Sequence, residues 1–579
     1  MTAPAAPAPH PFRAAFAAVV RAFRGPKPGS PWLTVFAFLA AGFVALPILA
    51  VLVNLLLPLS DVWRHLMATV LPEYLLNTAL LVLFVGAGTV IGGTGAAWLV
   101  TMCRFWGRPV LEVMLILPLA MPAYVMAYAY TDFLQYAGPV QTFLRATFEW
   151  GHGDYWFPQV RSLGGAAVLF VFVLYPYVYL MARAAFLEQS MCVLEVARSL
   201  GHGPWATFFR VALPLARPAI AGGAALALME TLADYGAVAY FGVPTFTTGI
   251  YRAWISMGDP VAAGQLASAL LGAIGLLVLA ERLSRGRVRY HNTSARTREI
   301  APTRLHGLRA TLAVLFCVLP VVVGFVLPCI ILFDLWLSTG RGIFSARFTA
   351  ALGNSLWLGL AAAALATLVA LGLGLARRFS PSRAVEAAAG VAGLGYAIPG
   401  AVIAAGVLLP FAAFDNALNA WMQSSYGVST GLLLTGSVAA LLFAYVVRFL
   451  AVAGGAIDSG LTRITPHMED AARALSRGPL DAFARVHLPL IAPSLLTAIL
   501  IVFVDVMKEL PATLLLRPFN VETLAVQAYA FAADERLAEA GLPALAIVAA
   551  GLAPVILMMR EIASARAGRR RPALALQAV

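Results

Sequence analysis

The sequence predicts an all-α polytopic membrane protein with about 12 transmembrane helices, arranged as two tandem groups of six. Apolar residues make up 61% of the 579-residue chain. Charged residues make up 12%, about half the share of an ordinary soluble domain. Apolar stretches long enough to cross a bilayer recur along the whole chain, and one 24-residue segment occurs twice. The composition therefore excludes a cytosolic globular enzyme.

Each predicted span contains about 20 mostly apolar residues, the length that crosses the hydrocarbon core. The first six are predicted at about 32–57, 76–100, 109–134, 165–187, 215–242 and 258–280. The second six are predicted at about 310–337, 354–376, 385–413, 430–456, 489–515 and 541–559. The first span is too long for a signal-peptide core, so we expect it to be retained.

The loops between the spans predict the domain boundaries and the orientation. We expect a cytoplasmic arm at 1–31, a first transmembrane domain at 32–282, a basic linker at 283–309, a second transmembrane domain at 310–561 and a basic tail at 562–579. Arginine accounts for most of the net charge of +13, and it is concentrated in the arm, the linker, the tail and every second loop. The positive-inside rule therefore places both termini in the cytoplasm, and the basic charge does not indicate nucleic-acid binding.

An internal duplication relates the two groups of spans. Glu195–Pro218 aligns without gaps to Asp470–Pro493 at an offset of 275, with 12 identities in 24 positions. Asn77 and Asn354, and Pro122 and Pro399, match at an offset of 277. Because each half has an even number of spans, both copies face the same way, which predicts a parallel repeat with a path between the halves.

The duplicated segment lies between the fourth and fifth spans of each half, at about 190–215 and 464–490; we call these two segments the elbows. In the first elbow, Gly201 suits a left-handed helix cap, and Gly203-Pro204 can open a second short helix. Pro214 and Pro489 are expected to mark where each elbow turns into the next span. The alternative is an amphipathic helix that rests on the lipid headgroups.

Charged residues also occur inside the predicted fifth and eleventh spans. Glu230 and Asp234 are expected to repel each other at i, i+4 on one helix, and Asp505 and Glu509 are their counterparts. Lys508 lies within reach of Asp505 in the sequence. Because a carboxylate at membrane depth is costly, these five residues are candidates for a path or gate. The alternative is that they lie at the outer rim, solvated or bonded to neighbours.

The elbows resemble the coupling loops of permease subunits in binding-protein-dependent ABC importers. The matching residues of the first elbow are Glu195, Ala197, Gly201, Gly203, Pro204, Leu213 and Pro214. Those of the second elbow are Glu469, Asp470, Ala472, Gly478, Pro479, Leu488 and Pro489. The sequence departs from the family pattern at Val196, at Asp470, which replaces the motif glutamate, and at Ser476, which stands where the first elbow has Gly201. Serine is less suited than glycine to positive φ, so the second turn is expected to differ.

This resemblance implies a type I ABC importer fold, fused from two six-helix permease domains in the bacterial inner (plasma) membrane. It implies ATPase subunits, expected in two copies, on the cytoplasmic side, and a periplasmic solute-binding protein. A P-loop needs lysine directly after glycine, and neither lysine of this chain (Lys27 and Lys508) follows one. We therefore expect a transport subunit that hydrolyses no ATP itself and carries no cofactor.

The segments 229–243, 245–251 and 508–518 are similar to ferric-iron importer permeases, which implies Fe(III) as cargo. A hard cation prefers oxygen ligands, but no ligand cluster of defined spacing is visible, so a permanent metal site is not expected. Thiamine, polyamine or phosphonate permeases remain alternatives with the same layout. An ion-coupled secondary transporter is an alternative of another class, and a membrane-embedded metalloenzyme has little support from the histidine pattern.

Overall fold

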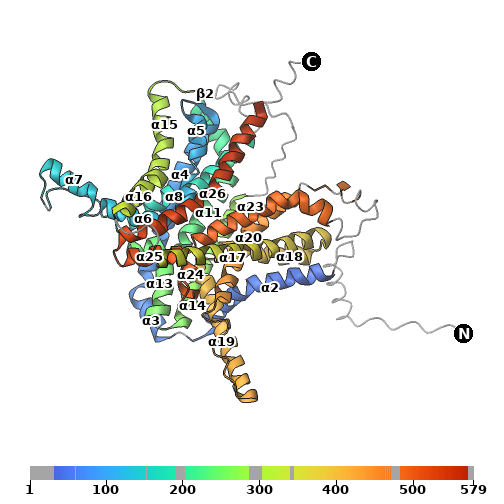
Figure 1. Ribbon diagram of the computed structural model, residues 1–579. Coiled ribbons are helices and arrows are strands. Elements are labelled where there is room, and N and C mark those ends of the chain that lie inside the picture. Colours follow the sequence, from blue (N-terminus) through green and yellow to red (C-terminus); the bar gives the residue numbers. More distant parts are fainter. Residues whose placement is uncertain are drawn as a thin grey trace. The chain divides into compact units, whose positions relative to one another are not determined.

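The computed structural model describes residues 31–58, 60–151, 153–188, 203–285, 303–338, 345–462, 464–465, 467–468, 470 and 483–570. These residues are almost entirely helical (Figure 1). The strands β1 (Cys103–Arg104) and β2 (Thr303–Arg304) form one short parallel pair. The predicted all-α class is therefore confirmed.

The helical elements of the first half, in chain order, are α2 (Pro31–Val53), η1 (Asn54–Leu56), α3 (Asp61–Thr69), α4 (Leu71–Met102), α5 (Arg108–Met114), η2 (Leu117–Ala120), α6 (Ala123–Leu134), α7 (Pro139–Phe148), α8 (Leu163–Glu188), α10 (Pro204–Thr207), η3 (Phe208–Ala212), α11 (Leu213–Ala233), α12 (Gly236–Tyr240), α13 (Phe246–Tyr251), η4 (Arg252–Ser256) and α14 (Pro260–Arg285).

Those of the second half are α15 (Leu308–Val321), η5 (Val322–Val326), α16 (Leu327–Ser338), α17 (Ala346–Phe379), α18 (Arg383–Ala392), η6 (Gly393–Ala397), α19 (Gly400–Tyr426), α20 (Val438–Leu461), η7 (Phe483–His487), α23 (Leu488–Met507), α24 (Pro511–Leu516), α25 (Leu524–Ala533) and α26 (Leu537–Arg570).

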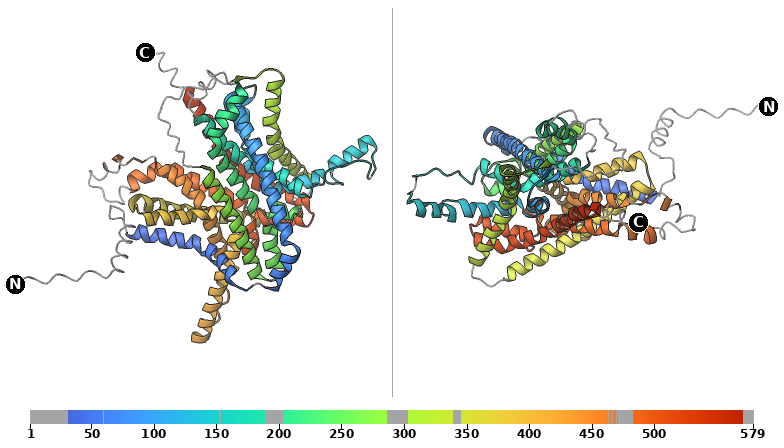
Figure 2. Two further views of the ribbon diagram at one scale, coloured as in Figure 1. Left: turned by 180° about the vertical axis from the view of Figure 1, so that it is seen from behind. Right: turned by 90° about the horizontal axis from the view of Figure 1, so that it is seen from above.

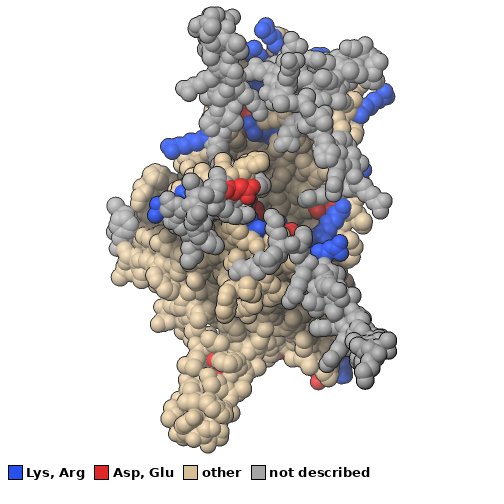
Figure 3. Space-filling view, turned by 90° about the vertical axis from the view of Figure 1, so that its right-hand side faces the viewer, with Lys and Arg blue, Asp and Glu red and all other residues tan. Residues whose placement is uncertain are grey.

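Eleven helices in the described part of the chain are long and apolar enough to cross a membrane, and a bent pair brings the total to 12. On the face shown in Figure 3, charged side chains are few and a broad uncharged surface lies between them. Hydrophobic side chains on such a surface suit contact with lipid. The predicted number of spans is therefore confirmed.

Four predicted spans are broken or end early in the structure, among them the span expected at 489–515, which ends at Met507. The span expected at 109–134 is broken, because the segments before and after Pro122 bend by 93°. Its counterpart expected at 385–413 is also interrupted, because α18 and η6 end at Ala397 and α19 begins at Gly400, directly after Pro399. Both prolines precede the first residue of a helix in an extended conformation, which proline accepts readily. The span expected at 215–242 ends at Ala233.

The chain forms two compact units, and each unit takes segments from both halves of the sequence. The first unit comprises the chain up to Ala50 together with Leu358–Ala397 and Leu442–Val506. Its helices α2, α17, α18, α20 and α23 lie side by side (Figure 1). The rings of Phe43 in α2 and Phe443 in α20 have centroids 4.0 Å apart. Aromatic packing thus joins the first helix of the chain to a helix of the second half.

The second unit comprises Val51–Trp357, Ile398–Leu441 and Met507–Val579. Its helices α4 and α11 both approach Val178 of α8 through a glycine, Gly93 and Gly223. A Cβ atom at either glycine would lie 2.7 Å from Val178. Small residues allow this close approach of backbones, which is the usual basis of helix packing in membranes. From this unit α7 projects outward, as the views from behind and from above show (Figure 2).

Candidate functional site

The structure describes the C-terminal end of each elbow. Pro204 begins α10, which confirms that Gly203-Pro204 opens a helix. Gly203 and Asp470 are exposed to solvent. The other predicted coupling residues of this part lie outside the described residues: Glu195, Ala197, Gly201, Glu469, Ala472, Gly478 and Pro479.

Each elbow continues into the next span through one π-helical turn, η3 in the first half and η7 in the second. The two turns are related by the 275-residue offset, and each directly precedes a Leu-Pro pair, Leu213-Pro214 or Leu488-Pro489. The N–H of Leu213 donates to the carbonyl of Phe208, five residues earlier. Proline has no N–H and its ring clashes with the carbonyl four residues before it, and the wider turn accommodates both effects.

Pro214 and Pro489 each lie in the first turn of a span helix, α11 or α23, as expected for the passage from elbow to span, but the helix is not interrupted there. The helix is continuous from Trp205 to Ala233, and in the second half from Arg485 to Met507. A proline near a helix N-terminus can be held within the helix when the preceding turn supplies a different hydrogen-bond register.

Two of the predicted gate carboxylates bind the N-terminal backbone of short helices. Asp234 Oδ1 accepts hydrogen bonds from the N–H groups of Ala237 (2.9 Å) and Val238 (3.2 Å), at the start of α12. Glu509 accepts from the N–H groups of Ala512 (2.9 Å) and Thr513 (3.0 Å), at the start of α24. The hydroxyl of Thr513 donates to the same carboxylate at 2.6 Å. Negative charge at these positions also suits the helix dipole.

The predicted like-charge repulsion between Glu230 and Asp234 on one helix is wrong. The helix α11 ends at Ala233, and Asp234 has extended backbone angles. The carboxylate therefore turns to the following helix rather than lying one turn above Glu230. Glu230, Asp505 and Lys508 are each partly buried, whereas Glu509 is 4% exposed.

Six tyrosines of the second unit surround the two capped helices, and we call them the tyrosine cluster. The rings of Tyr235 and Tyr251 stack with centroids 3.7 Å apart, and Tyr128 meets Tyr240 edge-on at 4.7 Å. Tyr128 is buried, and its hydroxyl has no hydrogen-bond partner among the described residues. The cluster comprises Tyr124, Tyr128, Tyr235, Tyr240, Tyr251 and Tyr529.

The tyrosine cluster joins the two sequence halves. Tyr124 donates to the carbonyl of Lys508 at 3.4 Å, and Tyr251 donates to the carbonyl of Pro511. The hydroxyls of Tyr235 and Tyr529 lie 3.4 Å apart. Polar contacts from α6, α13 and the break after α11 thus reach the break after α23, α24 and α25, and they hold the two sequence halves together at this point.

Gly236, the first residue of α12, allows this close packing. A Cβ atom there would lie 2.7 Å from the Cβ of Tyr124 and 2.8 Å from a side-chain carbon of Leu510. No other residue type fits without a shift of its neighbours. The two broken helices thus meet with a glycine at the contact.

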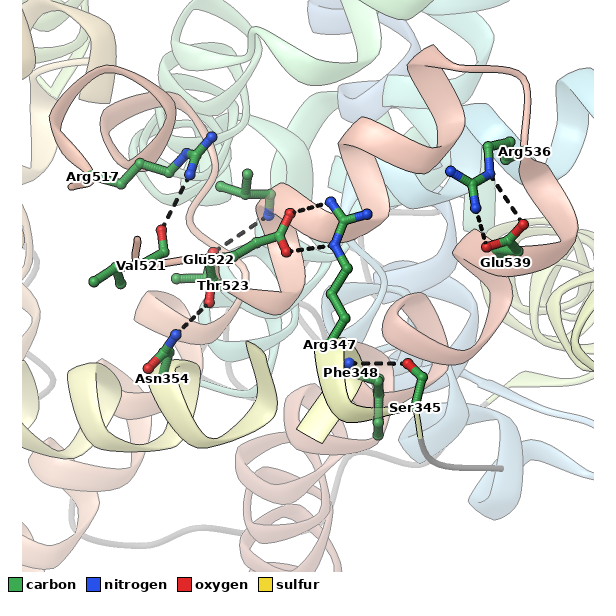
Figure 4. Close-up of polar contacts among 11 residues, drawn as sticks. Ser345, Arg347, Phe348, Asn354, Arg517, Val521, Glu522, Thr523, Arg536 and Glu539 are labelled. Atoms are coloured by element: carbon green, nitrogen blue, oxygen red, sulfur yellow. Dashed lines mark hydrogen bonds and ion pairs between the residues drawn. The ribbon is translucent and has the colours of Figure 1, made fainter. Parts of the chain in front are cut away.

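The matched asparagines make matched contacts. Asn77 donates to the carbonyl of Pro244 at 3.0 Å, and Asn354 donates to the carbonyl of Glu522 at 3.0 Å (Figure 4). In the second half, Arg347 also holds both carboxylate oxygens of Glu522, at 2.8 and 2.7 Å (Figure 4). In each half the second span thus fixes the loop that follows the capped helix.

The sequence analysis missed the tyrosine cluster. A signal for part of it was present, because Tyr124 and Tyr128 follow the duplicated Pro122 at a spacing that places them on one helix face. Lys508, which the sequence analysis placed with Glu509 among the candidate gate residues, contributes its carbonyl to the cluster. Within the described part of the chain, no group of three or more His, Cys, Asp or Glu side chains could hold a metal ion.

Comparison with known proteins gives the family. Residues 88–286 match the binding-protein-dependent transport system inner membrane components. The chain is 28% identical over 539 residues to the Fe(3+)-transport system permease protein FbpB 2 of Haemophilus influenzae, a match that covers 91% of this chain and 98% of that protein.

Shorter matches also occur with other permeases. A probable sulfate transport system permease protein, cysT of Chlorokybus atmophyticus, is 29% identical over 213 residues, or 36% of this chain and 70% of that protein. The molybdenum transport system permease protein ModB of Escherichia coli is 30% identical over 145 residues, or 25% of this chain and 60% of that protein. Residues 88–286 thus belong to the binding-protein-dependent transport system inner membrane components, and the chain as a whole is a multi-pass membrane protein that is similar to an Fe(3+)-transport permease over both of its halves.

Proposed function

We propose that this permease forms the inner-membrane path for Fe(III) delivered by a periplasmic binding protein. The supporting observation is the similarity to an Fe(3+)-transport permease across both halves and 98% of that protein. The sulfate and molybdenum permeases match only 36% and 25% of this chain. Two copies of an ABC ATPase, supplied as separate subunits, drive the import.

The two elbows are the ATPase-coupling loops in this proposal, and both termini are cytoplasmic. Support comes from the duplicated geometry, because a π turn and a Leu-Pro pair end both elbows in the same way. A shape repeated in both halves suits two identical ATPase subunits. The coupling residues are those that the resemblance to the family identified, including the seven that lie outside the described residues.

The path passes the tyrosine cluster in this proposal, with Glu230 and Asp505 at equivalent positions of the two halves as path residues. Asp234 and Glu509 hold the two short helices that close the gate, and Lys508 presents its carbonyl there. Contributions from both halves support this location, since opening requires the halves to move apart. Phenol groups are polar without carrying the charge that makes buried carboxylates costly.

The test is uptake of radiolabelled Fe(III) by cells that lack other ferric importers and express this chain with its ATPase and binding protein. We expect uptake that excess molybdate, sulfate, thiamine, polyamine or phosphonate does not reduce. Uptake should disappear when the ATPase is deleted and should persist when a protonophore collapses the ion gradient. Competition by one of these solutes would instead assign that cargo, and transport without the ATPase would indicate a secondary transporter.

A further inference from the structure

A buried ion pair lies immediately before the first elbow. Arg183, near the end of α8, donates from Nε and Nη2 to Oε1 of Glu112 in α5, at 2.9 and 2.6 Å. The Arg183 and Glu112 side chains are only 13% and 3% exposed. Tyr179 and Tyr175, on the same face of α8, donate to the carbonyls of Glu112 (2.6 Å) and Leu115 (2.7 Å). The end of α8 is thus fixed to α5; we call the Glu112–Arg183 pair the first anchor.

The second half has an ion-pair network at the equivalent position, but with reversed charge. Asp458 of α20 corresponds to Arg183 at the 275-residue offset of the elbows. Arg377 of α17 donates to Asp458 at 2.6 Å and binds both carboxylate oxygens of Glu386 in α18, at 3.1 Å each. We call these three residues the second anchor. Both helices that lead into the elbows are therefore tied to the short helix that starts the third span of their half.

The two anchors differ in exposure. The side chains of Arg377, Asp458 and Glu386 are 37%, 46% and 65% exposed. Exposed pairs are weak and are screened by salt, whereas loss of one partner from a buried pair leaves an uncompensated charge. The first anchor therefore holds its two helices rigidly together, whereas the second anchor allows its helices to move relative to one another.

The first anchor also lies on a direct route to the tyrosine cluster. The helix α5 continues through η2 and the break at Pro122 into α6, which carries Tyr124 and Tyr128. A force on the end of α8 reaches α5 through Arg183 and Glu112, and α5 is covalently joined to the helix that bears the cluster.

We propose that the anchors transmit motion of the elbows to the gate. The two halves transmit this motion unequally, because only the first anchor resists screening by salt. Arg183 and Glu112 are positioning residues in this scheme. The proposal rests on the proposed function in that the elbows receive the ATPase motion. It adds a role for residues outside the coupling loops and a functional asymmetry between the halves.

The test uses the complete complex of permease, ATPase and binding protein in proteoliposomes, with Fe(III) import per ATP hydrolysed as the readout. In Arg183→Gln and Glu112→Gln, we expect this ratio to fall about tenfold while ATP hydrolysis continues. Arg183→Lys, which keeps the charge, should lose less. The exchanged pair, Glu112→Arg with Arg183→Glu, should recover part of the ratio. Wild-type coupling in Arg183→Gln, or no recovery in the exchanged pair, would overturn the proposal.

Asp458→Asn is the matched variant of the second half. Raising the salt from about 0.1 M to about 1 M shortens the Debye length from about 10 Å to about 3 Å. The difference between Asp458→Asn and the wild type in Fe(III) import per ATP hydrolysed should therefore become smaller at high salt, because the wild-type second anchor is itself screened there. The defect of Arg183→Gln should not depend on salt. Equal salt dependence in the two variants would contradict the proposed asymmetry.

A readout without cargo separates this proposal from the identity of the substrate. Spin labels at the exposed positions Val110 of α5 and Phe143 of α7 report the bend between these helices. We expect trapping with ATP and vanadate to change their distance in the otherwise unmodified complex and not in Arg183→Gln. If iron is not imported but this difference holds, the proposed cargo is wrong and the proposed role of the first anchor stands. If iron is imported but both proteins respond alike, the proposed role of the first anchor is wrong.

Discussion

At the scale of single residues, the carboxylate of Glu509 receives three hydrogen bonds and that of Asp234 receives two from the helices they cap. Removal of a buried acceptor leaves its donors unsatisfied, at about 1–3 kcal/mol. We therefore expect Glu509→Ala to lower the free energy of unfolding by about 2 kcal/mol or more, and Asp234→Ala by less. Thermal unfolding of the purified permease in detergent measures both.

Glu509→Gln is the control, because the amide oxygen still accepts while the charge is lost. Its stability should fall between those of the wild type and Glu509→Ala. If Glu509→Gln and Glu509→Ala unfold at the same temperature, the charge and not the hydrogen bonding stabilises α24.

The sequence identified these carboxylates, and the alternative that they bond to neighbours fits Asp234 and Glu509, but the helix that precedes Asp234 was expected to continue too far. Helical periodicity continued past Asp234, so the end of α11 was not visible in the apolar pattern. A signal existed in the second half, where Pro511 follows Glu509 by two residues and proline favours the first turn of a helix. In the first half Gly236 occupies the position that corresponds to Pro511. A side chain at Gly236 would collide with Tyr124, and this constraint arises from the packing of segments that are far apart in the sequence.

At the scale of elements, the π turns η3 and η7 set the rotation of each elbow relative to its span. Pro214→Ala with Pro489→Ala restores an N–H and removes the ring clash, which favours an ordinary α-helical turn. We expect the free energy of unfolding to stay the same or rise by up to about 1 kcal/mol, because alanine is the better helix former. Fe(III) import should nevertheless fall about threefold or more, since each elbow is rotated.

The double variant Pro214→Ala with Pro489→Ala separates the effect of elbow rotation on import from any effect on the stability of the protein. Thermal unfolding and import are measured on the same preparation, with Pro218→Ala as a control one turn further into α11. Reduced stability of the double variant would show that the prolines hold the helices together rather than set the rotation of the elbows.

The element boundaries that the sequence predicted well are those marked by composition. The spans are apolar and their loops are not, so half of the spans were located to within five residues at both ends. Breaks inside apolar segments were not predicted, because Pro122 and Pro399 stand among residues as hydrophobic as the spans themselves. The duplication matched Pro122 with Pro399 but did not indicate that the chain breaks at either proline or bends by 93° in the first half.

At the scale of the whole molecule, the tandem repeat did not predict which helices pack together. The first unit joins α2 from the start of the chain to helices of the second half, with Phe36 over Gly372 and Phe43 against Phe443. Lipid is as apolar as a neighbouring helix, so hydrophobicity alone selects no partner in a membrane. The choice depends on the shapes of small and aromatic side chains, which periodicity does not encode.

The orientation of the chain is a prediction at the same scale, and a matched pair of tryptophans tests it. Trp106 lies in the arginine-containing loop after α4, and Trp156 lies in the loop after α7; both side chains are well exposed. In a variant without native cysteines, Trp156→Cys should react with a membrane-impermeant maleimide on intact spheroplasts. Trp106→Cys should react only after permeabilisation, because its loop is cytoplasmic by the positive-inside rule.

A separate variant that retains Cys103 as its one cysteine supplies a control, because Cys103 lies beside this loop. Burial raises the pKa of its thiol more than the nearby Arg108 lowers it, so little thiolate is available and labelling should stay slow even in permeabilised cells. Rapid labelling of Trp106→Cys and not of this native thiol then reports access to the loop alone. The reverse pattern for the two tryptophan positions would place the elbows outside the cell, where no ATPase could act on them.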